Sequence, residues 1–100
     1  MAFTEITKKG ISKFMLEPGV DPDKLSLHIS EAAAGGRVHP PHTHSGLEGF
    51  YMLEGHGAVE SASGVQPLGP GECVIVDATK PHGLANTGTT KMRYIVIIAK

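Results

Sequence analysis

The sequence predicts an all-β fold, either a β-sandwich or a small antiparallel β-barrel. Thirteen glycines and seven prolines interrupt a chain of 100 residues at short intervals. The runs between them are short and have the composition of strands, which is typical of many strands joined by turns. The run with helix-forming composition, residues 31–34, is stopped after one turn by Gly35 and Gly36.

The first strands are predicted from alternation and from turn residues. Residues 25–30 alternate strictly between apolar and polar side chains, which indicates a half-buried strand. Residues 48–53 are predicted to form another strand. A hairpin turn over residues 54–57 ends it, and residues 58–60 form the returning strand.

Two later runs, residues 73–76 and 93–99, are apolar on both faces. This pattern indicates strands that are covered on each side or that lie at a subunit contact. Cys73 begins the first of these runs, and we expect it to be a small buried hydrophobic residue. Met92 and Tyr94 are expected to pack in the core.

The length fits one domain with a single core. We expect residues 25–100 to form the barrel and residues 1–24 to form an N-terminal arm or edge strands. The formal net charge of −1, with scattered basic residues, argues against binding to nucleic acid or to an anionic membrane. No apolar stretch approaches the length of a membrane span.

A cytoplasmic location is expected. The chain has one cysteine, which cannot form an internal disulfide, and this fits a reducing compartment. The first residues lack the charged-then-apolar pattern of a signal peptide.

Three histidines and one glutamate form the most informative pattern. His42 and His44 are two residues apart, so a strand would place both imidazoles on one face. Glu48 follows after a short bend at residues 45–47, and His82 follows Pro81 at a later strand. Three imidazoles and one carboxylate suit a divalent transition metal. Because each imidazole must be neutral to bind, metal occupancy should fall at low pH.

The spacing of these residues resembles a signature of the cupin superfamily. The first cupin motif, G-x5-H-x-H-x3-4-E-x6-G, is matched at every fixed position by Gly36, His42, His44, Glu48 and Gly55. The resemblance implies a small double-sheet jelly roll with a metal in the barrel.

The second cupin motif, G-x5-P-x-G-x2-H-x3-N, is matched in part. Gly71, His82 and Asn86 stand at the expected positions, but Asp77 replaces the proline and Thr79 replaces the second glycine. The replaced residues shape the turn before the histidine, so the departures concern the loop more than the metal ligand.

Other side chains are candidates for the surroundings of the metal. Phe50 and Met52 share strand parity with Glu48, so they should line the same cavity or fill the barrel. His28 shares a face with serines, opposite three apolar residues, which favours an outward position. If that face is the inner one, His28 could act as an acid–base group. Tyr51 is the other acid–base candidate, and its parity points away from Glu48.

Three further polar side chains lie in or near the motif. Arg37 could hold an anionic substrate, although such a residue is more often on the surface. His56 lies in a turn, and His39 lies outside the motif register, so neither is expected to bind the metal.

One divalent transition metal per chain is expected, namely manganese, iron, nickel, copper or zinc, with manganese or iron favoured. The first hypothesis is a small-molecule dioxygenase, in which Phe50 and Met52 form a dry wall. The second is a lyase or isomerase acting on a carbonyl or sugar-like substrate, which needs an acid–base residue that faces the metal. The third, also implied by the resemblance, is a non-catalytic module that binds a small ligand. We expect a homodimer, as is common in the cupins that the chain resembles.

Overall fold

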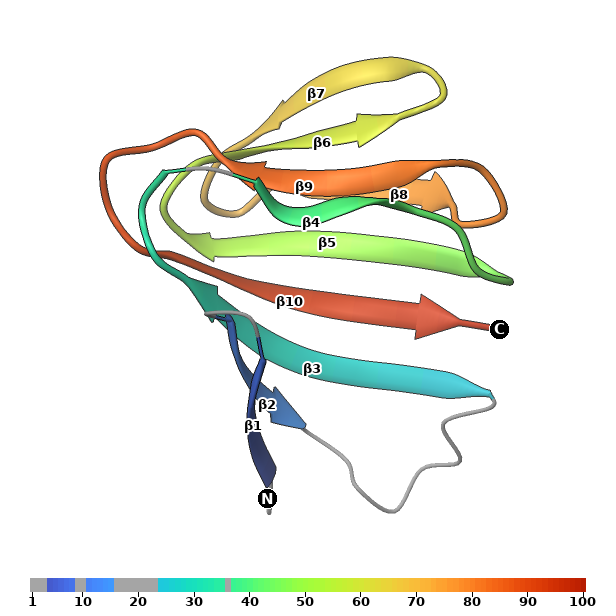
Figure 1. Cartoon of the computed structure of the whole chain (residues 1–100), viewed down its shortest axis with the longest axis horizontal. Coiled ribbons are helices and arrows are strands. Elements are labelled where there is room, and N and C mark those ends of the chain that lie inside the picture. The colour runs from blue at the N-terminus through green and yellow to red at the C-terminus, as the bar shows by residue number, and fades with distance from the viewer. Residues whose placement is uncertain (1–3, 9–10, 16–23, 36) are drawn as a thin grey trace.

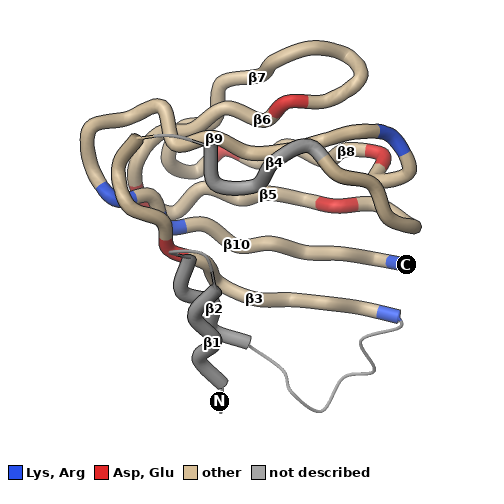
Figure 2. The backbone as a smooth tube through the Cα atoms, viewed as in Figure 1, with Lys and Arg blue, Asp and Glu red and all other residues tan. Residues whose placement is uncertain are grey.

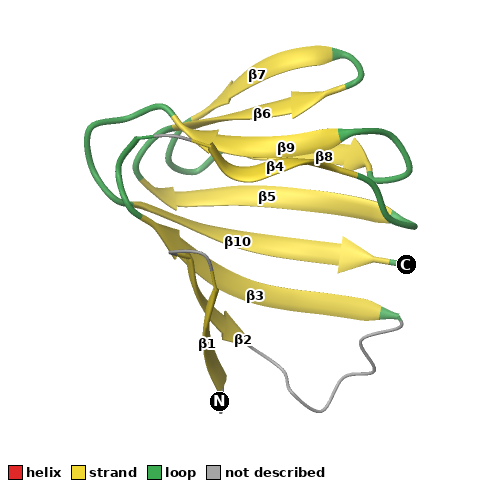
Figure 3. Ribbon diagram, viewed as in Figure 1, coloured by secondary structure: helices red, strands yellow, loops and turns green. Residues whose placement is uncertain are grey.

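The computed structural model describes residues 4–8, 11–15, 24–35 and 37–100, and it describes the side chains of residues 24–35 and 42–100. In these ranges the chain forms strands joined by turns and loops, with no helix (Figures 1 and 3). The strands are β1 (Thr4–Lys8), β2 (Ile11–Met15), β3 (Leu25–Ala32), β4 (Arg37–His42), β5 (Leu47–Glu54), β6 (Gly57–Ser61), β7 (Gly64–Leu68), β8 (Cys73–Asp77), β9 (His82–Asn86) and β10 (Met92–Ala99).

The strands form two antiparallel sheets, and the predicted fold class is confirmed. One sheet has the order β1-β2-β3-β10-β5-β8, and the other has the order β4-β9-β6-β7. Strands β1 and β2 pair with each other, and β2 also pairs with β3. The boundary between an arm and a barrel at residue 24 stays a prediction.

The core lies between the two sheets and takes residues from both. Val59 and Leu84 from the four-stranded sheet pack in one cluster with Phe50, Met52 and Tyr94 from the six-stranded sheet. Phe50 and Met52 are fully buried on the same side of β5 as Glu48, as their parity predicts. Both side chains fill the barrel, which is one of the two roles expected of them. Their contact with a substrate stays a prediction.

Strand β3 has the opposite orientation from the one that the sequence favours, in which His28 points outward. His28 and Ser30 are buried, whereas Leu25 is 36% exposed and Leu27 is partly exposed. The register places Ser30 directly across from Tyr94 on β10, so the polar side of β3 faces the polar end of a buried tyrosine. Alternation alone defines two faces but does not say which is inside, and here the polar face is the inner one.

Cys73 is exposed, so the expectation that it is buried was wrong. It points to the outer side of β8, where the neighbouring outward residue, Ile75, is 68% exposed. The expected core positions of Met92 and Tyr94 are confirmed, because both side chains are fully buried. Residues 31–34, whose composition suits a helix, instead end β3 and begin a bend.

The buried Tyr94 is expected to make the fold less stable at alkaline pH. Burial raises the pKa of its hydroxyl, the Ser30 side chain acts in the opposite direction, and the negative charge of Glu48 raises the pKa further. The unfolded chain loses this proton near the usual tyrosine pKa of about 10, whereas the folded chain retains it. The contribution is therefore fully present below about pH 10 and is lost as the pH rises above that value.

We predict that replacing Tyr94 with phenylalanine removes this part of the pH dependence of stability. Urea unfolding between pH 8 and 11 measures it, with Tyr51→Phe as the control because Tyr51 is partly exposed and is the other tyrosine of the chain. Equal alkaline loss of stability in both variants would contradict the assignment.

Candidate metal centre

Four side chains converge near one end of the barrel. His42 ends β4, His44 lies in the following loop, Glu48 is on β5, and His82 begins β9. One donor atom from each residue can be chosen so that all four atoms lie within 4.8 Å of one another. The structure thus brings together all four residues that the sequence singles out, and they form a group that is able to bind a metal ion.

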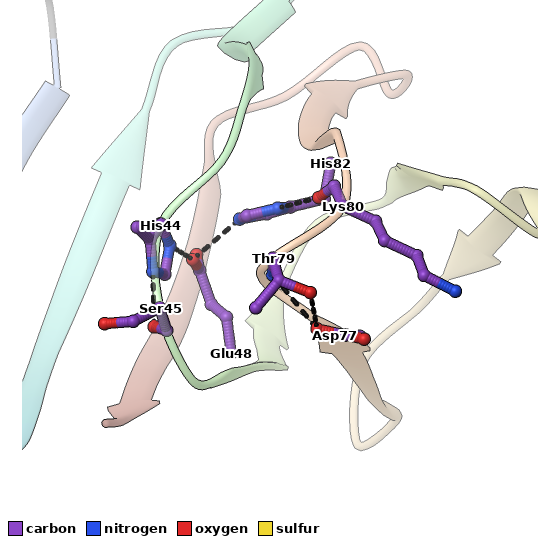
Figure 4. Close-up of polar contacts among 7 residues, drawn as sticks. All are labelled: His44, Ser45, Glu48, Asp77, Thr79, Lys80 and His82. Carbon is purple, nitrogen blue, oxygen red and sulfur yellow. Dashed lines mark hydrogen bonds and ion pairs between the residues drawn. The ribbon is translucent and has the colours of Figure 1, made fainter.

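A single carboxylate oxygen lies at the centre of the contacts. Oε1 of Glu48 is 2.6 Å from Nε2 of His44 and 3.0 Å from Nε2 of His82 (Figure 4). The ring of His42 packs beside both, with centroid distances of 5.4 Å to His44 and 4.4 Å to His82. Donor atoms that share one ion, with bonds of about 2.1 Å, lie roughly 3 to 4 Å apart, so the spacing suits a shared ion after small side-chain rotations.

The other ring nitrogens of two histidines have backbone partners. Nδ1 of His82 donates to the Lys80 carbonyl oxygen at 3.0 Å, and Nδ1 of His44 donates to the Ser45 carbonyl oxygen at 3.0 Å. Because carbonyl oxygens only accept, each of these Nδ1 atoms donates, and each Nε2 faces the Glu48 carboxylate. Toward that carboxylate Nε2 can donate a proton, or it can present a lone pair to a cation shared with the carboxylate oxygen.

Backbone hydrogen bonds hold the two ligand-bearing loops together. The His44 N–H donates to the carbonyl of Ala78 at 2.8 Å, and the Ala78 N–H donates to the carbonyl of Gly46 at 3.0 Å. The loop that carries His44 and leads to Glu48 is therefore joined to the turn that leads to His82. Gly46 has a φ of +92°, and an added Cβ there would lie 2.0 Å from the Ala99 carbonyl oxygen.

The two departures from the second motif form a turn of their own. Oδ1 of Asp77 accepts hydrogen bonds from the Thr79 hydroxyl at 2.6 Å and from the Thr79 N–H at 3.0 Å (Figure 4). The Thr79 hydroxyl is the main reason why the pKa of Asp77 lies below its usual value. This side-chain turn takes the place of the rigid Pro and Gly pattern before His82.

Asn86, the last motif residue, has a structural role. Its Nδ2 donates to the carbonyls of Ala33 at 3.0 Å and Thr90 at 3.1 Å, and its Oδ1 accepts from the Gly88 N–H at 3.0 Å. These bonds connect the end of β9 to the segment after β3.

The cluster is buried on one side and open on the other. The side chains of Glu48 and His82 are 5% and 1% exposed, that of His44 is 25% exposed, and His42 is exposed. The cluster is therefore in contact with solvent at His42 and His44, while Glu48 and His82 lie toward the interior.

The remaining candidates are placed as follows. Tyr51 is 38% exposed on the outer side of β5, so it does not face the cluster. His56 is exposed in the turn before β6, as expected. The side chains of Arg37 and His39 lie outside the described residues.

Two polar residues of the barrel interior were not predicted as part of the site. Tyr94 and Ser30 lie on the inner face of the six-stranded sheet, together with His28 and Glu48. The signal that could have found Ser30 is its parity with His28, but the sequence favoured the opposite face.

A sequence profile for a family described as "Cupin domain" matches residues 28–98. The chain belongs to the cupin domain family. This range begins in β3 and ends in β10, and it contains all four residues of the cluster.

Several solved structures share the fold at low sequence identity. A sugar phosphate isomerase of the cupin superfamily, from Silicibacter pomeroyi, has a TM-score of 0.75 and 20% sequence identity to this chain. The match covers 91% of this chain and 60% of that protein. This chain thus spans less than two thirds of that isomerase. The cupin domain of an XRE family transcriptional regulator from Enterobacter cloacae has a TM-score of 0.79 and 18% identity, over 92% and 98% of the two chains. Ectoine synthase from P. lautus has a TM-score of 0.74 and 23% identity, over 95% and 67%.

Comparison with curated protein sequences gives no match for this cupin. Within the described residues, no helix has the length and apolar character needed to cross a membrane.

We predict that removing one donor from the cluster weakens metal binding. Glu48→Gln and His82→Ala should each raise the dissociation constant for a divalent metal by about 100-fold, because both residues are buried contributors to one site. Isothermal titration calorimetry measures the change, with His56→Ala as the control. Unchanged affinity in both variants would contradict the assignment.

We predict that Gly46→Ala destabilises the fold and weakens metal binding, because the added side chain strains the backbone of the loop between His44 and Glu48. A side chain at a positive φ costs about 1 kcal/mol, and here the Cβ also clashes with the Ala99 carbonyl. Gly71→Ala is the matched control, because Gly71 has a φ of +81° but nothing within 4 Å of its added Cβ. The thermal unfolding temperature and the metal affinity should both fall further in Gly46→Ala than in Gly71→Ala. Equal losses in the two variants would show that the clash has no effect.

Proposed function

We propose that this cupin is a metal-dependent enzyme that moves a proton on a small carbonyl or sugar-like substrate, as an isomerase or lyase does. The observation that carries the proposal is the cluster of His42, His44, Glu48 and His82, open to solvent on one side, together with a histidine buried on the inner face of the same sheet as Glu48. A bound divalent metal would supply a Lewis acid that polarises a substrate oxygen.

His28 is the proposed proton-transfer residue. It is 5% exposed on the inner face of β3. The register places it across from Val96, which pairs in turn with Phe50, two residues along β5 from Glu48. An imidazole can both accept and donate a proton near neutral pH, so His28 has the chemistry that this reaction class needs.

The inward orientation of His28 favours the isomerase or lyase over the oxygenase. The sequence favoured an oxygenase because both acid–base candidates pointed away from the metal ligands. Tyr51 does point away, but His28 shares the inner face with Glu48. This orientation supports the proposal of proton-transfer chemistry.

Tyr94 would contribute as a hydrogen-bond donor. It is fully buried, and burial raises the pKa of its hydroxyl, so the group keeps its proton at neutral pH. A protonated hydroxyl on the inner face can orient a substrate oxygen or donate to one on which negative charge develops.

A dioxygenase is the second candidate, with manganese or iron as its metal. Four protein donors on an octahedral ion leave about two positions open, and none of the four is a thiolate. Phe50 and Met52 are fully buried beside Glu48 and would keep water from part of the site. Both candidates take a small-molecule substrate.

The test uses tag-free protein loaded in turn with manganese, iron, nickel, copper or zinc. The loaded protein is incubated in D2O with a panel of sugar phosphates and hydroxy-carbonyl compounds, and NMR measures deuterium incorporation into each compound. The proposal predicts incorporation that depends on metal, is lost in His28→Gln, and leaves metal affinity unchanged in that variant.

Other results would decide against the proposal. Oxygen consumption without deuterium incorporation would establish the dioxygenase instead. Saturable ligand binding with neither activity would make the chain a binding module. Equal deuterium incorporation by His28→Gln and by the unaltered protein would remove His28 from the mechanism.

A further inference from the structure

A cleft lies between the β6–β7 hairpin and strand β8. Strand β7 is at one end of the four-stranded sheet, and β8 is at one end of the six-stranded sheet. The cleft has a volume of about 400 Å³ and is lined by Val59, residues 61–67, residues 74–77 and Lys80. None of the four residues of the metal cluster lines it. We propose that this cleft binds a small amphiphile with an anionic head group, and that the bound molecule changes the metal affinity of the neighbouring cluster.

The cleft exists because the inner face of the hairpin is exposed near its turn. On β7, Gln66 and Gly64 share parity with the buried Leu68, yet both are exposed. The register pairs Gln66 with Val59 and Gly64 with Ser61, so these four positions form the inner face of the hairpin at this end. Figure 1 shows the hairpin at the margin of the fold. A ligand can therefore enter between the two sheets here without displacing a strand.

The floor of the cleft is apolar. Val59 from β6 and Val74 and Val76 from β8 line it, and all three belong to the hydrophobic core. Val74 and Val76 retain exposed fractions of 9% and 7%, whereas Phe50 on the neighbouring strand is fully buried. An apolar ligand body that covers the two valines removes their remaining contact with water, which is favourable in proportion to the apolar area covered.

The walls of the cleft add neutral hydrogen-bonding groups. The hydroxyl oxygens of Ser61 and Ser63 lie 3.0 Å apart, and Gln66 is exposed on the neighbouring strand. Figure 2 shows β7 and the turn before it in the colour of uncharged residues. Most of the cleft therefore suits a neutral ligand body, and charge is present only at the end formed by β8 and the turn after it.

Lys80 supplies the one positive charge among the lining residues. It forms no ion pair with any residue that the structure describes. Figure 4 shows its side chain directed away from the ring of His82. Asp77 is the one acidic lining residue, but its Oδ1 accepts two hydrogen bonds from Thr79, and its parity on β8 is opposite to that of Val76. The Lys80 ammonium group therefore favours an anionic head group such as a carboxylate.

The turn that carries Lys80 also positions the metal cluster. The Lys80 carbonyl accepts a hydrogen bond from Nδ1 of His82 at 3.0 Å. On the floor of the cleft, Val76 lies directly across from Glu48 in the register of β8 and β5. A ligand that contacts Lys80 and Val76 therefore touches the immediate neighbours of two cluster residues. If the ligand changes the metal affinity, the metal must change the ligand affinity by the same factor.

Octanoate is the first probe, because it has a carboxylate and an apolar chain. Octanol and octylamine have a chain of the same length with a neutral and a positive head group. Heteronuclear NMR of the full chain without metal should show saturable octanoate binding, with a dissociation constant below about 1 mM and shifted resonances within residues 59–80. Octanol should bind more weakly, and octylamine weakest, because the Lys80 ammonium repels its charge.

Two variants test the two parts of the site. Lys80→Gln removes the charge but keeps the carbonyl that His82 contacts, so it should weaken octanoate binding by about fivefold and leave octanol binding unchanged. Its control is Lys24→Gln, since Lys24 is an exposed lysine before β3. Gln66→Trp fills the cleft and should abolish binding of both probes. Its control is Thr89→Trp in the exposed loop after β9, and circular dichroism checks that each variant is folded.

The link to the metal cluster is measured with zinc. Isothermal titration calorimetry should give a zinc dissociation constant that octanoate changes by about fivefold or more. Zinc should change the octanoate dissociation constant by the same factor. Both effects should disappear in Gln66→Trp, because its cleft is filled.

Four results would overturn the proposal. The first is an absence of saturable octanoate binding to the unaltered protein. The second is octanoate binding that Gln66→Trp leaves intact, since it would use another surface. The third is octylamine binding as tight as that of octanoate, which excludes an anionic ligand class. The fourth is a zinc affinity that octanoate leaves unchanged, or changes equally in Gln66→Trp, because either result excludes coupling through the cleft.

Discussion

The buried carboxylate of Glu48 is the constraint around which this cupin is built. Its side chain is 5% exposed, and Oε1 lies between the Nε2 atoms of His44 and His82. A buried carboxylate is costly unless positive charge or hydrogen-bond donors compensate it. Backbone carbonyls accept from the Nδ1 atoms of both histidines, so the Nε2 atoms face the carboxylate. A cation shared by these atoms would compensate the buried negative charge.

The surrounding fold positions this group through short loops. The Ala78 backbone joins the loop of His44 to the turn before His82, and the Asp77–Thr79 hydrogen bonds close that turn. The loop hydrogen bonds are local, whereas the convergence of β4, β5 and β9 depends on both sheets. Ligand geometry and fold stability are therefore coupled.

The sequence predicts the cluster well because most of its ligands lie close together along the chain. His42, His44 and Glu48 lie within seven consecutive positions, and His82 is found from the second motif. The all-β class also follows from the turn residues and the short apolar runs. What the sequence could not decide is which face of β3 is inside, because alternation is the same for either orientation. The inner face was decided by the neighbours of His28 on β10, which are distant in sequence.

Strand β5 shows why the two sides of one sheet have different roles. Glu48, Phe50 and Met52 point inward, toward the cluster and the core, while Leu47 and Tyr51 are exposed on the outside. The same reasoning explains why Cys73 was misplaced. An apolar run indicates a strand that is covered on each side or that lies at a subunit contact, and in the single chain the outer face of this run is exposed.

X-ray absorption spectroscopy of the metal-loaded protein tests the central claim most directly. The account predicts one metal per chain with nitrogen and oxygen donors at about 2.1 Å, scattering from three imidazole rings, and no sulfur at about 2.3 Å. Loss of one imidazole in His82→Ala should leave two rings in the spectrum. A spectrum that lacks imidazole scattering, or that is identical in His82→Ala, would contradict a metal held by His42, His44, Glu48 and His82.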